Sequence, residues 1–540
     1  MLDILIKNAR IVDGTGNPWF RGDIGVFQGY IVTMDRHVDE SAHLVIDADG
    51  RVASPGFIDI HSHDDLSFPR DPDNLSKLSQ GVTTVVVGNC GFSMYPTVPE
   101  TKSQSCAFLA SLSKHVTEDD LYHQIHDYSS SLEKQGLTTN MASLAGHGAI
   151  RVAVMGYDPG PPSREQLSEM KRLLREAICG GAFGLSIGLI YAPGSFANTA
   201  ELTELAKTAG ECGGFLAAHI RTYGTCLLES IEELLEILKE ARIPGQLSHL
   251  EAVGAENWGK VSQALALMEE ARRLGIDITC DMYPYTVAST TLISLLPPWA
   301  QEGGIDNLSA LLDDEEKRAR IKHETLNGMS DKMWECKVNL VGWKNITASS
   351  VSSAKYKAYE GKNFQELADE LGKDPFDILT TLLVADRGKT LGLMSAFHPE
   401  DILAVFASPL HMVGSDGIWT CDGKPHPRQY GTFSKVLRHM VHDTGILTLE
   451  EAVRKMTSQP AGRLGLLGRG ILKPGMAADI IIFSPDEVED VATFDNPRGL
   501  SKGFSHVIVN GKLAFCDGKL QGERPGRFLK HGRPCLNSAR

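Results

Sequence analysis

The 540-residue sequence has no run of apolar residues that approaches the roughly 18 needed for a membrane-spanning helix. Its first residues, MLDILIKNARIVDGTG, lack a positively charged segment followed by a long apolar one, so we predict no signal peptide. Blocks of Lys and Arg are also missing, and 53 basic against 68 acidic side chains give a formal net charge of −15. No basic excess is available to displace counterions from nucleic acid. We therefore expect no membrane and no nucleic-acid partner, and a cytoplasmic location.

Cysteine is sparse, with ten residues at irregular spacing, which excludes a disulfide-based scaffold. We expect reduced thiols, most of them buried as small apolar side chains. Internal repeats and low-complexity tracts are absent as well. Hydrophobic residues at 42% and charged residues at 22% are instead typical of a globular protein with an ample core.

Both ends of the sequence are patterned as short strands separated by Gly or Asp turns. The predicted strands are Asp3–Ile6, Arg10–Val12, Gly22–Val26, Tyr30–Val32, Ala478–Phe483 and His506–Lys512. Because neither end buries much alone, we predict that residues 1–55 and 466–540 pair into one small β-sandwich domain. Two independent β appendages are the alternative.

Between the two ends, strand and helix patterns alternate. Helical spacing of apolar residues is clearest in Ser163–Cys179, Thr199–Cys212 and Ser230–Ala241. Apolar strands are predicted at Thr83–Val87, Gly184–Gly188, Phe215–His219, Gln246–His249, Asp277–Asp281 and His411–Asp416. Repeated βα units of this kind indicate an α/β fold with a parallel sheet. We predict a TIM-like (β/α)8 barrel over residues 56–465, with an open doubly wound sheet as the alternative.

Residues 295–350 interrupt this alternation. They contain Pro297-Pro298-Trp299 and the charged run Asp313–Arg318, but no clean βα unit. We predict a helical insertion that lies over the barrel mouth, and we interpret the charged run as a solvated helix face.

Residues that bind metals stand at the ends of the predicted strands. His61 and His63 are two residues apart, so they share one face of a strand end and can hold a metal together. Cys90 follows an apolar strand, where a thiolate can bind or bridge cations. Taken alone, such histidines are more often ordinary surface residues, and such a cysteine is more often an inert buried thiol.

Two further strands end in histidine, and a third ends in aspartate. His219 and His249 are 30 residues apart, about one βα unit, so neighbouring barrel strands bring both rings to one ion. Asp416 lies between glycines after the last predicted strand. Four histidines, a cysteine and an aspartate at strand ends are a donor set suited to one or two Zn²⁺ ions.

With these residues in place, the sequence resembles the amidohydrolase superfamily and, within it, the N-acyl-D-amino-acid deacylase (D-aminoacylase) family. The segment PGFIDIHSH marks the superfamily, whereas GNCGFS, DMYPYT and HPRQYGTF together are much more specific to the deacylases. Other similar segments are IVDGTGNPWFRGDIGV, GAFGLSIGLIYAPG, AAHIRT, QLSHLEAVG, VGSDG and ADIIIF. The resemblance spans the whole length and implies zinc-dependent hydrolysis of the N-acyl amide bond of N-acyl-D-amino acids, which are small-molecule substrates.

The resemblance also implies roles for individual residues. One zinc ion would be bound tightly by Cys90, His219 and His249, and a second, weaker position would lie among His61, His63 and Asp416 with Cys90 shared. Asp416 would be the catalytic acid and base. Substrate would be bound by Tyr191, Tyr283, Ser289 and Arg428, with Arg428 on the substrate carboxylate.

One position departs from the family pattern. His249 is followed by Leu250-Glu251, where relatives often have His-Lys. An inward-facing Glu251 would disfavour acidic substrate side chains, whereas an outward-facing one would be merely solvated. Side-chain preference, acyl preference and oligomeric state are thus left open.

Two other functions are compatible with part of the pattern. A cyclic amidase of the hydantoinase or dihydroorotase type would use a bridging lysine, whose motif is not evident, and Cys90 argues against it. A non-catalytic amidohydrolase-like scaffold would have lost metal ligands, whereas all six positions are filled here.

Overall fold

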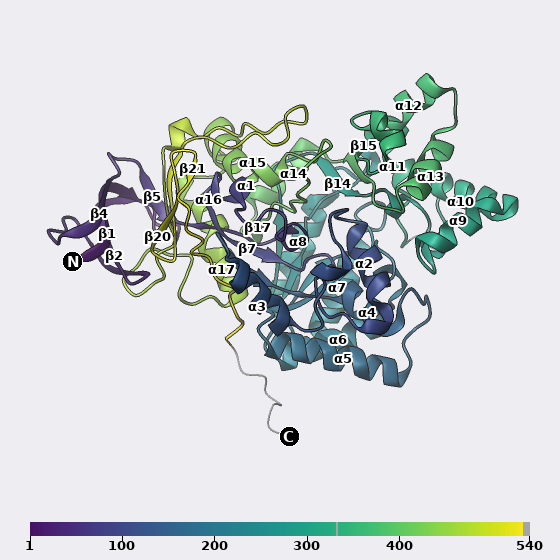
Figure 1. The fold of residues 1–540 in the computed structure, drawn as a ribbon, viewed down its shortest axis with the longest axis horizontal. Helices are drawn as coiled ribbons and strands as arrows, with labels where there is room; N and C mark the ends of the chain where they lie inside the picture. The colour runs from purple at the N-terminus through teal and green to yellow at the C-terminus, as the bar shows by residue number, and fades with distance from the viewer. Residues whose placement is uncertain (331–332, 533–540) are drawn as a thin grey trace.

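A computed structural model describes residues 1–330 and 333–532 of the chain. A β domain at one end contains the first strands and the last strands of the chain, a barrel occupies the middle, and a mainly helical region projects at the other end (Figure 1). None of the described helices combines the length and apolar character that crossing a bilayer requires.

The β domain is one mixed sheet to which both ends of the chain contribute. Its order is β21-β20-β19-β18-β5-β1-β2-β3, with β4 paired to β1. Ile480 of β18 pairs with Pro55 of β5, so the C-terminal strands extend the N-terminal ones and are not a separate appendage. The strands are β1 (Leu2–Ile11), β2 (Phe20–Phe27), β3 (Tyr30–Asp35), β4 (Ala42–Asp47), β5 (Val52–Pro55), β18 (Ile480–Phe483), β19 (Phe504–Val509), β20 (Lys512–Cys516) and β21 (Lys519–Leu520).

The barrel consists of parallel strands in the order β6-β7-β8 and β9-β10-β11-β12-β13-β17. The ring closes where Ser62, after β6, pairs in parallel with Gly417, after β17. The strands are β6 (Phe57–Asp59), β7 (Val82–Val87), β8 (Asn140–Ser143), β9 (Ala145–Gly146), β10 (Gly184–Gly188), β11 (Phe215–His219), β12 (Gly245–Leu247), β13 (Ile278–Met282) and β17 (His411–Val413). These strands confirm the predicted TIM-like barrel.

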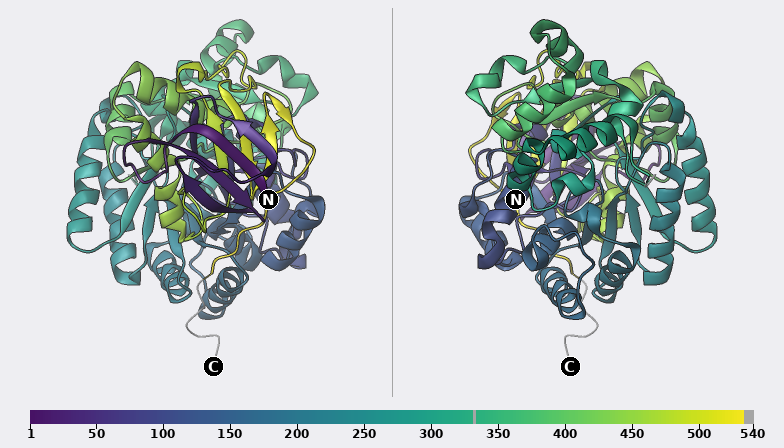
Figure 2. Two further views of the ribbon diagram at one scale, coloured as in Figure 1. Left: turned by 90° about the vertical axis from the view of Figure 1, so that its left-hand side faces the viewer. Right: turned by 90° about the vertical axis from the view of Figure 1, so that its right-hand side faces the viewer.

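Helices surround the barrel strands (Figure 2). The three helices predicted from apolar spacing are confirmed as α5 (Arg164–Cys179), α6 (Thr199–Glu211) and α7 (Leu227–Ala241). A capping box formed by Ser163 and Gln166 fixes the start of α5. The others are α1 (Leu75–Leu78), α2 (Lys102–Ala110), α3 (Ile125–Gln135), α4 (His147–Met155), α8 (Lys260–Arg273), α14 (Pro399–Ala407), α15 (Arg428–Lys435), α16 (Leu449–Met456) and α17 (Ser458–Leu464).

Between β13 and β17 the chain forms a separate layer. The sequence pattern predicted a helical insertion there but not the strands that accompany it. Three antiparallel strands in the order β14-β16-β15 are accompanied by five helices. Their bounds are β14 (Val287–Thr291), α9 (Ile305–Asp313), α10 (Glu315–Asn327), α11 (Lys337–Val341), β15 (Ile346–Ser350), α12 (Phe364–Leu371), α13 (Pro375–Ala385) and β16 (Leu391–Ser395). The charged run 313–318 spans the end of α9 and the start of α10 and is exposed, as expected for a solvated helix face.

The expectation of reduced thiols is confirmed for eight cysteines in the part of the chain that the structure describes, and it is wrong for one. Cys179, the last residue of α5, is disulfide-bonded, whereas the Cys90 thiol is free. Sparse, irregular cysteines exclude a disulfide scaffold but do not prevent a single bond where folding brings two sulfur atoms together.

Candidate metal centre and active site

Five barrel strands deliver the six predicted metal ligands to one end of the barrel. His61 and His63 follow β6, Cys90 follows β7, and His219 ends β11, while His249 and Asp416 follow β12 and β17. All six are buried. The backbone at Cys90, His249 and Asp416 has positive φ values of 53°, 34° and 48°, which non-glycine residues adopt at an energetic cost. The chain therefore turns sharply at three of the six predicted ligands.

The ligand atoms form two groups that share one sulfur. In each group the atoms all lie within 4.8 Å of one another, and the groups are His61, His63, Cys90 and Asp416, and Cys90, His219 and His249. The Sγ atom of Cys90 lies 3.3 Å from His61 Nε2 and 3.8 Å from His249 Nε2. The structure therefore brings together every ligand that the sequence pattern predicted.

The chemistry of this cluster fits a bound cation. Both ring nitrogens of His219 and Nδ1 of His249 are buried without a hydrogen-bond partner among the described residues. Burying such atoms unpaired is unfavourable, so a ligand for them is expected. Sulfur, imidazole nitrogen and carboxylate oxygen together are donors that zinc accepts.

Burial also sets the protonation states of Cys90, His219 and His249. It raises the pKa of the Cys90 thiol to about 11 and lowers the pKa of His249 to about 4. The imidazole of His219 is likewise kept neutral, because burial and the neighbouring His249 lower its pKa well below the usual value. Neutral imidazoles are the form that binds metals, and a coordinated thiol loses its proton.

Asp281, which the sequence pattern did not predict, contacts two of the predicted ligands. Its Oδ1 lies 3.0 Å from His61 Nδ1 and accepts the backbone N–H of His249 at 2.9 Å, while Gln246 donates to Oδ2 at 2.6 Å. Although burial opposes it, Asp281 raises the pKa of His61 well above its usual value. The position at the end of a strand in DMYPYT is the sequence signal that would have identified it.

A second network of buried hydrogen bonds fixes the backbone next to Asp416. Lys77 donates to Asp59 Oδ2 and to Ser415 Oγ, both at 2.7 Å, and Ser415 N donates to Asp59 Oδ1 at 2.8 Å. The backbone immediately before Asp416 is thereby fixed to β6. Lys77 lies in the short helix α1, where no strand-end signal marks it in the sequence.

Asp416 and Arg428 form a buried ion pair beside the ligands. Arg428 Nη2 lies 2.8 Å from Asp416 Oδ2 and donates to the carbonyl oxygen of Ser289 at 3.1 Å. The guanidinium carbon lies 4.5 Å above the ring of Tyr283. Although burial opposes it, Arg428 and His61 hold the pKa of Asp416 well below its usual range, so its carboxylate is charged. The Nε and Nη1 atoms of Arg428 have no partner among the described residues and are available to a ligand.

The remaining predicted residues border the same space. Tyr191 and Thr290 join their hydroxyl groups at 2.8 Å. Tyr283 donates its hydroxyl to Glu251 Oε2 at 3.3 Å. Glu251 is only 7% exposed and lines the cavity next to His249, so the outward-facing interpretation of this residue is wrong.

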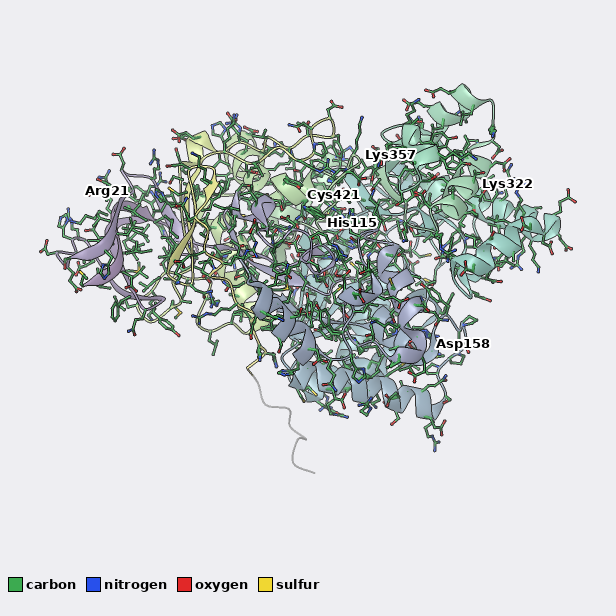
Figure 3. The ribbon with its side chains drawn as sticks, viewed as in Figure 1. Arg21, His115, Asp158, Lys322, Lys357 and Cys421 are labelled. Atoms are coloured by element: carbon green, nitrogen blue, oxygen red, sulfur yellow. The ribbon has the colours of Figure 1, made fainter. Side chains whose placement is uncertain are left out.

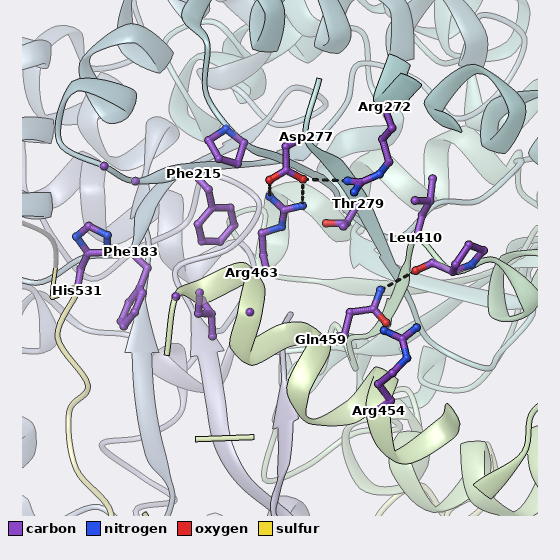
Figure 4. A pocket seen from close by; sticks show the side chains of 17 residues that line it. Phe183, Phe215, Arg272, Asp277, Thr279, Leu410, Arg454, Gln459, Arg463 and His531 are labelled. Atoms are coloured by element: carbon purple, nitrogen blue, oxygen red, sulfur yellow. Dashed lines mark hydrogen bonds and ion pairs between the residues drawn. The ribbon is translucent and has the colours of Figure 1, made fainter. Parts of the chain in front are cut away.

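The cavity over the metal ligands is narrow, about 30 Å³, and is lined by residues that include Tyr191, His219, His249, Tyr283 and Asp416. A larger cavity of about 340 Å³ lies between α2 and α9 and shares Tyr191 with it. A third, of about 380 Å³, is lined by residues that precede β10, β11, β12, β13 and β17, at the opposite end of the barrel. There Asp277 accepts from Arg272 and Arg463 (Figure 4). This third cavity is therefore separate from the metal ligands.

A further group of metal-binding residue types lies at the surface. His115, Cys421 and Asp422 come within reach of one another, with Cys421 Sγ 3.4 Å from His115 Nε2 (Figure 3). Lys114 and Lys357 already pair with Asp422 at 2.6 and 3.2 Å. The carboxylate is thus neutralised by the chain itself, which disfavours a metal there.

Comparisons with known proteins agree with this geometry. Residues 44–515 match the amidohydrolase family. The N-acyl-D-glutamate deacylase of Alcaligenes xylosoxydans xylosoxydans is 34% identical over 530 residues, which cover 98% of this chain and 96% of that relative.

Two solved structures are similar over nearly the whole chain. The N-acyl-D-glutamate deacylase of Bordetella bronchiseptica, complexed with zinc and a phosphonate that mimics the tetrahedral intermediate, has a TM-score of 0.84 and 33% identity and covers 98% of this chain and 99% of its own. A D-aminoacylase has a TM-score of 0.83 and 31% identity and covers 98% of this chain and 100% of its own.

Proposed function

The chain belongs to the amidohydrolase family, and from this we propose that it hydrolyses the N-acyl amide bond of N-acyl-D-amino acids. The observation that carries the proposal is the placement of Cys90, His219 and His249 around one point, beside the buried pair of Asp416 and Arg428. The first group can hold a metal ion, and the pair supplies a charged base next to a cation for a substrate carboxylate. A small-molecule substrate and a cytoplasmic location are part of the proposal.

Zinc is the ion that we propose. Cys90, His219 and His249 would hold one ion tightly, and His61, His63 and Asp416 would surround a second, weaker position with Cys90 shared. When bound, zinc supplies water with a lowered pKa and a positive charge for a developing oxyanion.

Asp416 is the proposed acid and base. Its carboxylate is charged before reaction because Arg428 and the two histidines stabilise that form against burial. It can therefore take a proton from the water that attacks the substrate carbonyl and then pass the proton to the leaving amine nitrogen. The networks through Asp281 and through Lys77 and Ser415 hold the groups that this transfer requires in place.

Arg428 is the proposed anchor for the substrate carboxylate. Its Nε and Nη1 atoms have no partner among the described residues, so each has a hydrogen-bond donor available to a substrate carboxylate. The ring of Tyr283 holds the guanidinium in position. Ser289 and the hydroxyl of Tyr191 complete the proposed substrate contacts.

A substrate panel tests the proposal directly. The zinc-loaded protein should hydrolyse N-acetyl-D-amino acids and leave N-acetyl-L-amino acids, hydantoins and dihydroorotate largely intact. Turnover of the cyclic amides alone would support the cyclic amidase alternative. Negligible zinc in the purified protein, with no activation by added metal, would support a non-catalytic scaffold.

A further inference from the structure

Besides Asp416, the cavity beside the predicted metal ligands is lined by two carboxylic side chains and one amine. Glu251, Glu335 and Lys337 all line it, and all three are buried. The same wall is apolar between them and is formed by Val253, Ala288, Met394 and Ala396. The cavity therefore combines an aliphatic surface with an excess of carboxyl groups.

Glu335 has its own partners within the chain. Its Oε2 accepts the backbone N–H of Tyr223 at 2.6 Å and the hydroxyl of Thr222 at 2.9 Å. Its Oε1 lies 3.3 Å from the ammonium of Lys337. The charge of Lys337 is thus matched by Glu335, and Glu335 is held without any contribution from a substrate.

Glu251 has no cationic partner of this kind among the described residues. Its Oε2 accepts the Tyr283 hydroxyl at 3.3 Å, and its Oε1 lies 3.9 Å from Nδ1 of His249, whose ring is a predicted metal ligand. Arg428 is already paired with Asp416. One buried carboxyl group therefore faces the cavity without a matching positive charge, and such a group is stabilised by any donor or cation that reaches it.

The position of Glu251 relative to the carboxylate anchor places it where a substrate side chain would end. Tyr283 stacks under the guanidinium of Arg428 and donates its hydroxyl to Glu251, so the two groups lie on opposite parts of one tyrosine. A substrate whose carboxylate is bound by Arg428 would direct its side chain along the apolar wall toward Glu251.

We propose, resting on the function proposed above, that this cavity binds the side chain of a D-amino acid that ends in an amine on a short methylene chain. The methylenes would contact Val253 and Met394, and the ammonium would donate to Glu251. An acidic side chain would instead bring a third carboxylate to Glu251 and Glu335. N-Acyl derivatives of D-ornithine and D-lysine belong to the favoured class, and those of D-glutamate and D-aspartate to the disfavoured one.

The test compares kcat/KM of the zinc-loaded wild-type protein for N-acetyl-D-ornithine, N-acetyl-D-lysine, the neutral N-acetyl-D-norleucine and N-acetyl-D-glutamate. A charge-assisted hydrogen bond predicts that the better amine exceeds norleucine by about 10- to 100-fold, with glutamate lowest. Equal or faster turnover of norleucine or glutamate would overturn the inference while leaving the deacylase proposal intact. Turnover of none of the D-substrates would overturn both.

A variant then assigns the preference to Glu251. Glu251→Gln keeps the size of the side chain and removes its carboxyl group, so the ratio of amine to norleucine kcat/KM should fall toward one. Because the readout is a ratio between substrates, losses in folding or zinc loading cancel. The matched control is Glu256→Gln, an exposed glutamate in the same loop, which should leave the ratio unchanged. An unchanged ratio in Glu251→Gln would contradict the assignment.

Discussion

Asp416 combines two properties that a single side chain rarely has in a protein interior, since it is buried and yet kept charged. The Arg428 guanidinium and the two neighbouring histidines stabilise the carboxylate against burial. Replacing it with asparagine keeps the shape but removes the proton acceptor. We expect Asp416→Asn to lower kcat by about 10²- to 10⁴-fold, as is typical for loss of a general acid or base. Steady-state kinetics measure kcat, and metal analysis of the same preparation measures the zinc content.

The matched variant is Cys90→Ala, which removes a ligand shared by both groups of metal-binding residues. Asp416→Asn should retain the tightly bound zinc, whereas Cys90→Ala should lose it together with activity. Wild-type turnover in Asp416→Asn would show that another residue transfers the proton.

For individual residues, the sequence pattern identified the side chains that the structure brings together, but not the residues that support them. His61, Cys90, His219 and Asp416 were identified because each stands at the end of an apolar strand, where barrel sites are built. Lys77 has no such signal, because its role depends on a contact with Ser415, 338 residues away in the sequence. The orientation of Glu251 was also open, since a sequence does not specify which side of a strand-end loop faces inward.

At the scale of elements, strand β13 contributes Asp281 between the ligands of two other strands. Its carboxylate contacts His61, after β6, and the backbone of His249, after β12. We expect Asp281→Ala to weaken zinc binding by about 10- to 100-fold, because supporting hydrogen bonds orient metal ligands. Competition with a zinc chelator measures the affinity, and an unchanged affinity would contradict the positioning role.

Strand β17, which Asp416 follows, begins with the titratable residue His411. His411 is fully buried, and burial together with nearby Lys455 lowers its pKa well below the usual value. The unfolded chain binds a proton on this residue below about pH 6.5, while the folded chain does not. His411 therefore makes the free energy of unfolding decrease as the pH falls through 6.5, by about 1.4 kcal/mol per pH unit.

His411→Gln removes that titration and keeps a donor for the Met282 carbonyl, which His411 Nε2 approaches at 3.3 Å. Urea unfolding at about pH 7.5 and about pH 5.5 should show a smaller loss of stability in the variant than in the wild type. An equal loss in both proteins would show that His411 is protonated in the folded state.

Six barrel strands were predictable as elements because each is a short apolar run between turn signals. Strands β8 and β9 were not, because Asn140–Ser143 and Ala145–Gly146 are short, small and partly polar, with no apolar alternation. Strands β14 and β15 are rich in Ser and Thr and are defined by antiparallel pairing to β16, which lies up to about 100 residues away.

At the scale of the whole molecule, the two ends of the chain pair in one sheet, and this sheet packs against the barrel. The strand patterns at both termini predicted a shared β domain, but not the single polar residues that help to join this domain to the barrel. Asp479, just before β18, pairs with Arg469 and accepts from the amide of Asn140 in barrel strand β8 at 3.2 Å. Asn510, after β19, donates to Asn140 Oδ1 at 2.8 Å and gives its backbone N–H to Asp479 at 2.8 Å.

This network predicts that the β domain stabilises the barrel without taking part in chemistry. Asp479→Ala should lower the free energy of unfolding by about 1–3 kcal/mol, because it removes the carboxylate that accepts from the buried Asn140 amide and pairs with the Arg469 guanidinium. Urea unfolding measures the loss, and Asp486→Ala, an exposed aspartate of the same domain, is the matched control. Zinc content and kcat of the folded variant should equal those of the wild type. A loss of zinc in Asp479→Ala would show that the β domain also determines the geometry of the metal ligands.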